Sequence, residues 1–164
     1  MSEPPGAAVI HLVRHAHAVA RERWEDDDAL RPLSRLGHAQ AELLAERLAA
    51  LRASRIVSSP ALRCAQTVAP LATQTRLHVE EVAFLAEGTP AEPALAGLID
   101  AAATGPVVAC THGDVLGLVL DHLAQQGTEF SSPRHVPKAG TWELVLQGER
   151  VATARLVPAP AAAG

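Results

Sequence analysis

The chain alternates short apolar runs with longer segments in which apolar residues recur every three or four positions. The short runs, rich in β-branched residues, predict buried strands at residues 8–13, 55–58, 78–83 and 107–111. The longer segments have helical spacing and predict helices at residues 35–52, 61–72, 89–103 and 115–126. Near the end of the chain, two further apolar runs flank the letters QGE, which predicts a β-hairpin.

Two of these helices have recognisable starts. Ser34 directly precedes the first helical segment and is a residue type that caps helix N-termini. The letters TPAE at residues 89–92 have the form of a capping box with proline at the first helical position. We therefore expect the third helix to begin there and to run to about Ala103.

Strands that alternate with helices predict an α/β fold, in which helices cover both faces of a mostly parallel sheet. We expect a three-layer α/β/α sandwich formed by one domain over residues 1–157, followed by a disordered tail at residues 158–164. In sheets of this kind, ligands bind beyond the carboxyl ends of the strands. The residues that follow each strand are therefore the first place to look for chemistry.

Composition narrows the classes of function. The net charge is −4, which does not suggest a nucleic-acid partner, and no apolar run is long enough to cross a membrane. The first residues do not resemble a signal peptide, and Cys64 and Cys110 do not form a Cys-x-x-Cys pair. We expect a cytoplasmic protein whose thiols are reduced core residues, and which is a monomer or a homodimer.

Three predicted strands end in residues that can do chemistry. The first is followed by Arg14 and His15, and the second by Ser58 and Ser59, with Arg63 one turn into the next helix. The strand at residues 107–111 leads into the third group, which consists of His112, Gly113 and Asp114. Since parallel strands end at one edge of the sheet, a single pocket could collect two guanidinium groups and two imidazoles.

Two guanidinium groups and two imidazoles suit phosphoryl chemistry. Arginine binds phosphate oxygens through paired N–H donors, and a neutral imidazole can attack phosphorus. A His-x-His pair such as His15 and His17 also opens many metal hydrolases. However, no set of Asp, Glu and His with metal-ligand spacing follows it here. We therefore expect no metal and no cofactor.

Three motifs, LVRHAHA, SSPALRCAQT and CTHGD, resemble in order and spacing those of the histidine phosphatase superfamily, which is phosphoglycerate mutase-like. The resemblance covers nearly the whole chain. The short length of the chain is similar to that of the SixA-like branch of small phosphatases. The resemblance implies that His15 is the nucleophile that becomes phosphohistidine, and that Arg14, Arg63 and His112 complete the phosphate pocket. Gly113 and Arg21 are further candidates for substrate binding. Ala16 departs from the common pattern, in which glycine follows the nucleophile.

The general acid is the least defined part of the site. In relatives that cleave phosphate esters, a glutamate follows the third strand in a Leu-x-Glu pattern, which Leu85 and Glu87 match here. Glu81, which we place within the strand, and Asp114 are the alternatives, and SixA-like members often lack this acid. Glu87 is therefore our candidate for the acid.

Other charged residues have plainer interpretations. If the first strand continued past His15, His17 would point away from it, and we expect His17 to face substrate or solvent. The acidic run from Glu25 to Asp28 is typical of a solvated loop. Arg21, Arg23 and Lys138 could bind additional phosphates of a larger substrate.

The sequence thus predicts a metal-independent phosphatase that acts through phosphohistidine. Its partner would be a phosphohistidine protein or a small phosphorylated metabolite or nucleotide. The alternatives are a non-catalytic phosphate-binding domain and a phosphotransferase of the phosphoglycerate mutase type. Mutases typically need more sequence to cover the pocket than this chain offers.

Overall fold

The computed structural model describes residues 8–162 and places a seven-stranded sheet at its centre. The strands are β1 (Val9–Arg14), β2 (Arg55–Ser58), β3 (Val79–Glu81), β4 (Val107–Thr111), β5 (Glu129–Phe130), β6 (Thr141–Gln147) and β7 (Arg150–Val157). Four α-helices accompany them within the described residues: α1 (Arg35–Ala49), α2 (Leu62–Thr75), α3 (Ala91–Ala101) and α4 (Gly113–Gln125). Single turns of 3-10 helix occur at Arg21–Arg23, Asp28–Leu30, Ala83–Leu85 and Ala102–Thr104.

The strand order is β3-β2-β4-β1-β6-β7-β5. The pairs β3–β2, β2–β4, β4–β1 and β7–β5 are parallel, whereas β6 is antiparallel to both β1 and β7. The predicted mostly parallel sheet is therefore confirmed, and the predicted hairpin is β6–β7, with its turn at Gly148 and Glu149. The very short strand β5 was not predicted.

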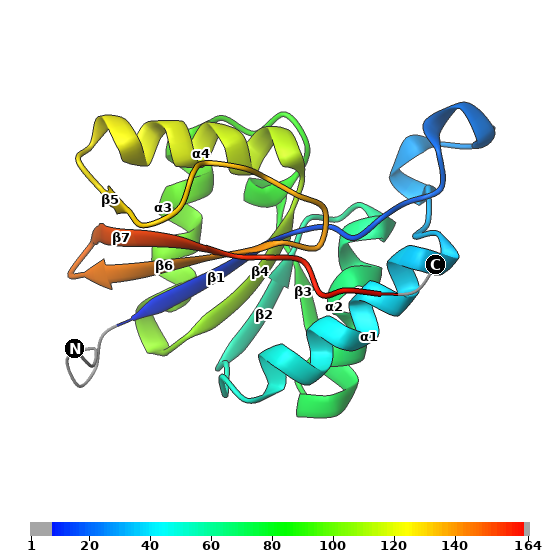
Figure 1. The fold of residues 1–164 in the computed structure, drawn as a ribbon, viewed down its shortest axis with the longest axis horizontal. Helices are drawn as coiled ribbons and strands as arrows, with labels where there is room; N and C mark the ends of the chain where they lie inside the picture. Colours follow the sequence, from blue (N-terminus) through cyan, green and yellow to red (C-terminus); the bar gives the residue numbers. More distant parts are fainter. Residues whose placement is uncertain (1–7, 163–164) are drawn as a thin grey trace.

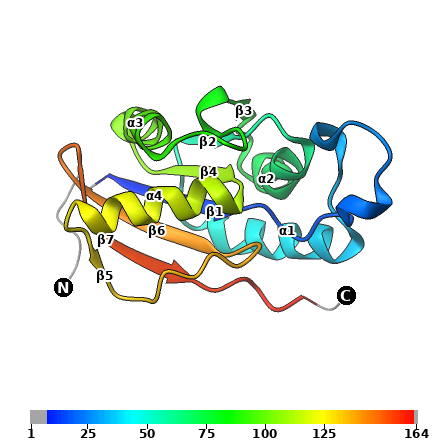
Figure 2. The ribbon, with the colours of Figure 1, turned by 90° about the horizontal axis from the view of Figure 1, so that it is seen from above.

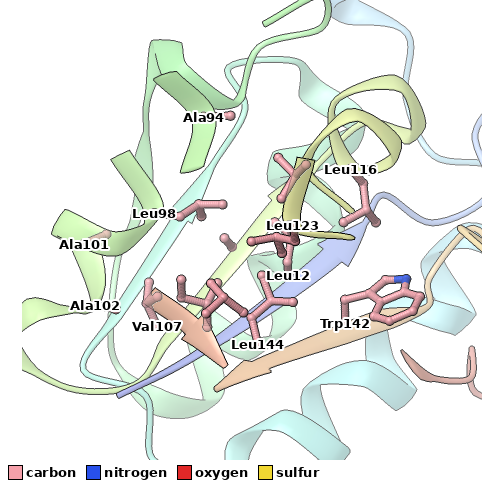
Figure 3. Packing of buried hydrophobic residues seen from close by; sticks show 14 of the residues in the cluster. Leu12, Ala94, Leu98, Ala101, Ala102, Val107, Leu116, Leu123, Trp142 and Leu144 are labelled. Carbon is pink, nitrogen blue, oxygen red and sulfur yellow. The ribbon is translucent and has the colours of Figure 1, made fainter. Parts of the chain in front are cut away.

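Helices cover both faces of the sheet, as predicted (Figure 1). Helices α3 and α4 pack over one face, where Leu12, Leu98, Leu116 and Trp142 lie in one buried cluster (Figure 3). Helices α1 and α2 pack together on the other face around a second cluster built largely from leucine, valine and alanine. A core of small aliphatic side chains suits a chain with so few aromatic residues, and Trp142 is a packing residue.

The two predicted helix starts have different outcomes in the structure. Ser34 caps α1 as expected, since its Oγ accepts a hydrogen bond from the Gly37 amide (3.1 Å). By contrast, TPAE does not form a capping box, because the Thr89 hydroxyl donates to the Ala86 carbonyl (2.6 Å) and Pro90 takes the N-cap position.

The chain after β7 follows α1 at its start. Arg47 on α1 donates a hydrogen bond to the Pro158 carbonyl (2.6 Å), and Ala159 packs against the cluster beneath α1 and α2. The first two residues of the predicted disordered tail thus have contacts with the domain, and disorder of the tail stays a prediction. Residues 163–164 of that tail lie outside the described part of the chain.

A long loop between β1 and α1 projects from one end of the sheet, beside α1 and α2 (Figure 2). A bridge between Ala18 and Leu33 closes its base. The loop therefore leaves the sheet at the carboxyl end of β1 and returns beside it. It is placed to form one wall of any pocket at that edge.

Candidate active site

The carboxyl ends of β1, β2 and β4 meet at one edge of the sheet, because these strands are neighbours and parallel. A cavity of about 540 Å³ opens there. Its walls contain all the predicted site residues, which are Arg14, His15, Arg21, Arg63, Glu87, His112 and Gly113. The structure thus brings together side chains that lie up to about a hundred positions apart in the sequence.

His15 has two contacts with backbone carbonyls, one at its own amide and one at its ring. Its amide donates to the Thr111 carbonyl (3.0 Å), and its Nδ1 lies 2.8 Å from the Ala16 carbonyl oxygen. A carbonyl can only accept, so Nδ1 carries the proton and Nε2 keeps its lone pair. Burial lowers the pKa of His15 to about 3, and the charges of His112, Arg63 and Arg14 act in the same direction. The ring is therefore neutral at physiological pH.

Arg14 lies beside His15, with its guanidinium packed flat on the turn that begins α4. Its Nη1 donates to the Val136 carbonyl (2.7 Å), while its buried Nε has no partner among the described residues. A Cβ at Gly113 would lie 2.8 Å from the guanidinium carbon. Glycine at 113 is therefore needed for Arg14 to occupy this place.

Arg63 comes from the first turn of α2 and is only 2% exposed. Its Nη1 donates to the Asp28 carbonyl (2.9 Å). Its Nη2 lies 3.2 Å from carboxylate oxygens of both Asp28 and Glu87, and 3.4 Å from Nδ1 of His112. In this structure the guanidinium of Arg63 is therefore paired with the carboxylates of Asp28 and Glu87.

His112 faces His15, with ring centroids 5.6 Å apart and ring planes at 69°. The position of its ring is fixed by Ser59 at the end of β2, whose Oγ lies 2.8 Å from Nε2. Cys64 Sγ approaches the same nitrogen to 3.6 Å. Because Nε2 faces Ser59 and Cys64, the Nδ1 edge of the ring points toward Arg63.

Glu87 lies in the loop before α3 and contacts two arginines. Its carboxylate lies 3.2 Å from Arg63 and 3.6 Å from Arg21. The next residue, Gly88, donates its amide to the Asp114 carboxylate (2.9 Å), which links this loop to α4.

The alternative acids are placed differently from Glu87. Asp114 accepts bonds from the backbone amides of Gly88 and Val115, whereas Glu81 is an exposed residue of β3. Of the three candidates, Glu87 is the one whose carboxylate contacts a predicted phosphate ligand, Arg63. Its role as acid stays a prediction.

His17 also lines the cavity, which agrees with the expectation that it faces substrate or solvent. Strand β1 ends at Arg14, so the alternation of sides does not apply two residues later. The Ser34 hydroxyl donates to the His17 carbonyl (3.1 Å) and lies 2.6 Å from His17 Nδ1, which must then be the donor. The unprotonated Nε2 is therefore the nitrogen that His17 can offer to a ligand.

Sequence reasoning missed the part played by Asp28 and Arg31. Asp28 was assigned to a solvated acidic run, yet it contacts Arg31 (2.9 Å) as well as Arg63. Arg31 is 7% exposed and lines the cavity. The available indication was the position of the acidic run between two arginines, because arginines that become buried need anionic partners.

The remaining features concern metals and membranes. Within residues 8–162, no group of three or more His, Cys, Asp or Glu side chains is arranged to hold a metal ion. None of the helices in this described range is long and apolar enough to cross a membrane.

The geometry suits an oxyanion. A neutral imidazole with a free nitrogen lies among two guanidinium groups and a second imidazole, within one polar cavity. Such a set can bind a phosphoryl group through its oxygens and present a nucleophile to its phosphorus.

Comparison with known proteins points the same way. Residues 10–90 match the model of the family described as histidine phosphatase superfamily (branch 1). An 8-oxo-(d)GTP phosphatase of Mycolicibacterium smegmatis (strain ATCC 700084 / mc(2)155) is 32% identical over 165 residues. That match covers 96% of this chain, which spans only about half (51%) of the relative's length.

Solved structures share the fold at lower identity. The protein histidine phosphatase SixA complexed with tungstate superposes with a TM-score of 0.72 at 18% identity, covering 91% of this chain and 94% of that one. A mycobacterial glucosyl-3-phosphoglycerate phosphatase in complex with inorganic phosphate gives a TM-score of 0.67 at 20% identity, covering 95% and 98%. These likenesses identify the architecture, which is phosphoglycerate mutase-like.

Proposed function

Since this chain belongs to the histidine phosphatase superfamily, we propose that it is a phosphatase that acts through a phosphohistidine intermediate on His15. The observation that carries the proposal is the state of the His15 ring. Its Nδ1 proton is held by the Ala16 carbonyl, its pKa is about 3, and its other nitrogen is free. A neutral, oriented imidazole in a cavity with two arginines has the properties of a phosphoryl acceptor.

The reaction then proceeds in two steps. His15 Nε2 forms a bond to phosphorus while the bond from phosphorus to the leaving oxygen or nitrogen breaks, and the leaving group takes a proton. Water then attacks the phosphohistidine, which releases inorganic phosphate and restores neutral His15. Arg14, Arg63 and His112 stabilise the charge on the phosphoryl oxygens in both steps. We propose that Glu87 donates the proton to the leaving group in the first step. In the second step its carboxylate accepts a proton from the attacking water.

For the substrate we favour a small phosphorylated metabolite or a nucleotide over a phosphohistidine protein. The cavity, at about 540 Å³, has room for more than a phosphate group, and Arg21 and Lys138 add positive charge to its walls. The M. smegmatis relative is named for a nucleotide substrate, which supports this choice.

The test is to replace His15 by Ala and to assay an aryl phosphate. We expect turnover to disappear, while replacement of the exposed His38 by Ala leaves it unchanged. Radiolabelled phosphate should be trapped on the unaltered protein at alkaline pH, where phosphohistidine survives, and not on the His15→Ala variant. Retention of most activity by that variant would refute the mechanism.

Three further observations would favour other functions. Loss of activity with EDTA would indicate metal-dependent chemistry. Binding of phosphate without turnover of any tested substrate would favour a phosphate-binding domain. Transfer of the label to a second substrate rather than to water would favour a phosphotransferase.

A further inference from the structure

Arg63 is held at two of its nitrogens by one residue of the β1–α1 loop. The Asp28 carbonyl accepts from Nη1 (2.9 Å), and the Asp28 carboxylate lies 3.2 Å from Nη2. These two contacts fix both the plane and the direction of the guanidinium. A side chain that is 2% exposed and held in this way cannot turn without moving the loop.

Asp28 is itself fixed. Its carboxylate accepts from Arg31 Nε at 2.9 Å, and Arg31 Nη1 donates to the Val19 carbonyl (2.8 Å) across the loop. The hydrogen bond from Arg31 lowers the pKa of Asp28, and the charge of Arg63 adds to this effect. Asp28 is therefore ionised, and it connects a buried arginine of the loop to the arginine of the cavity.

Glu87 contacts Arg63 from the opposite chain segment and is held less firmly. It shares Nη2 with Asp28, so two carboxylates compete for that nitrogen, and His112 Nδ1 lies 3.4 Å from it. Apart from Arg63, its charged neighbour is Arg21 at 3.6 Å, and both of these side chains are largely exposed, at 47% and 66%. An anion that enters the cavity can take the place of Glu87 more easily than that of Asp28.

We propose that Asp28 is a positioning residue that holds Arg63 for the phosphoryl group, and that the substrate's phosphate displaces Glu87, not Asp28, from Arg63. The displaced Glu87 keeps Arg21 as its charged neighbour in the wall of the cavity. This inference rests on the proposed function only in taking phosphate as the ligand. It gives the two carboxylates on Arg63 opposite effects on anion binding.

The test measures binding of inorganic phosphate by calorimetry. Replacement of Asp28 by Ala should weaken binding about tenfold, the effect expected when a charged hydrogen bond that orients a ligand group is lost. Asp28→Asn should recover part of the affinity, because its single amide oxygen can still accept from one of the two arginines, Arg31 or Arg63. Glu87→Gln should instead tighten binding, because it removes the competing charge. Asp26→Ala is the control, since the Asp26 carboxylate accepts from the Asp27 amide on the same loop.

Kinetics with an aryl phosphate provide a second readout. Asp28→Ala should lower kcat in the native background and have much less effect when Arg63 is already replaced by Lys, because it acts through Arg63. Equal losses in both backgrounds would indicate a structural role and overturn the proposal. Phosphate binding that is unchanged or tightened in Asp28→Ala would also overturn the proposal. So would a thermal midpoint of Asp28→Asn that is low enough for partial unfolding to explain its weaker binding.

The two proposals can fail separately. If the unaltered protein turns over aryl phosphates while Asp28→Ala binds and reacts normally, the positioning role is wrong and the phosphatase stands. If the protein shows no turnover while Asp28→Ala still weakens phosphate binding, the positioning role stands without the catalytic one.

Discussion

At the scale of single residues, the proposed role of Glu87 as the acid predicts which leaving groups the site can use. Its carboxylate contacts Arg63 and Arg21 and lies in the wall of the cavity. If it donates the proton, Glu87→Gln should lose activity in proportion to the leaving-group pKa, by ~10²-fold or more for alkyl esters. Aryl phosphates and phosphohistidine, which leave more readily, should lose little.

The measurement is kcat/KM for the Gln variant over a series of leaving groups. The same loss on every substrate would make Glu87 a part of the phosphate pocket and not an acid. If no substrate is affected, the acid is Glu81 or Asp114, or the site has none. Glu81→Gln tests the first of these alternatives, and Glu46→Gln, at an exposed position of α1, serves as the control.

His15 also makes the stability of the protein depend on pH. Its pKa is about 3 in the folded chain, because of burial, and about 6.5 in the unfolded chain. Between these values the unfolded chain binds more protons at this residue, so His15 destabilises the fold as pH falls from 6.5 toward 3. At about 1.4 kcal/mol per pKa unit, the contribution should reach roughly 2–3 kcal/mol at pH 4.5 and roughly 4–5 kcal/mol near pH 3.

Urea unfolding at pH 7 and pH 4.5 checks this effect. The free energy of unfolding should fall more for the native protein than for a His15→Asn variant, which has no proton to gain. The same pH dependence in both would show that His15 is not the source. Other titrating groups, including His11, whose pKa burial also lowers, are common to both proteins and cancel in the comparison.

Sequence patterns predicted the site residues at strand ends, and in the loops they predicted Arg21 and Glu87 but missed Asp28. His15, Arg63 and His112 follow or adjoin strands, and the sheet topology alone brings them together. Asp28 and His17 reach the cavity through the path of the β1–α1 loop. That path is set by tertiary contacts such as the Ser34 and Arg31 hydrogen bonds, which leave no periodic pattern in the sequence.

At the scale of elements, α1 meets the loop after His15 at a glycine. A Cβ on Gly37 would overlap the His17 carbonyl oxygen, although alanine is otherwise the better helix former. We expect Gly37→Ala to destabilise the protein by about 1–3 kcal/mol, because the gain in helix propensity is smaller than the cost of the overlap. It should also lower phosphatase activity, because His17 lies two residues from His15.

Gly117 offers the matched control on another helix. A Cβ there meets no atom within 4 Å, so Gly117→Ala on α4 should stabilise the protein by about 0.5–1 kcal/mol and leave activity unchanged. Thermal unfolding and aryl phosphate turnover of both variants make the comparison. Stabilisation by Gly37→Ala would mean that α1 can move away from the loop at no cost.

The elements themselves were largely predictable, with errors at their ends. Strands β2 and β4 have the predicted bounds, since their apolar runs end abruptly at polar residues. The start of α3 was placed one residue early, because Thr89 uses its hydroxyl on Ala86 and leaves the capping pattern unused. Strand β5 has two residues, too few to show an alternation.

At the scale of the whole molecule, the alternation of strands and helices was enough to predict the three layers. It was not enough to predict strand order, because nothing local distinguishes the crossover that puts β4 between β1 and β2. That order matters for function, since it makes β2, β4 and β1 direct neighbours and so concentrates their polar ends. A chain with a net charge of −4 thereby gains a cavity rich in arginine.

The distribution of charge around that cavity leads to a prediction about substrate size. Arg14 and Arg63 lie deep in the site, whereas Arg21 is 66% exposed in the loop wall. A nucleoside diphosphate bound with one phosphate at His15 has its second phosphate farther out, near Arg21. Arg21→Ala should therefore raise KM for a nucleoside diphosphate by roughly 2- to 5-fold, the effect of losing one exposed ion pair, and leave KM for an aryl phosphate unaffected.

Arg23→Ala is the control for this prediction, because Arg23 does not line the cavity. An equal effect of Arg21→Ala on both substrates would mean that Arg21 acts through Glu87. A third outcome is that neither substrate is affected and that a phosphohistidine protein is turned over faster than both. A phosphohistidine protein is then the better assignment for the substrate, because a protein surface needs no contact inside the cavity beyond the phosphoryl group.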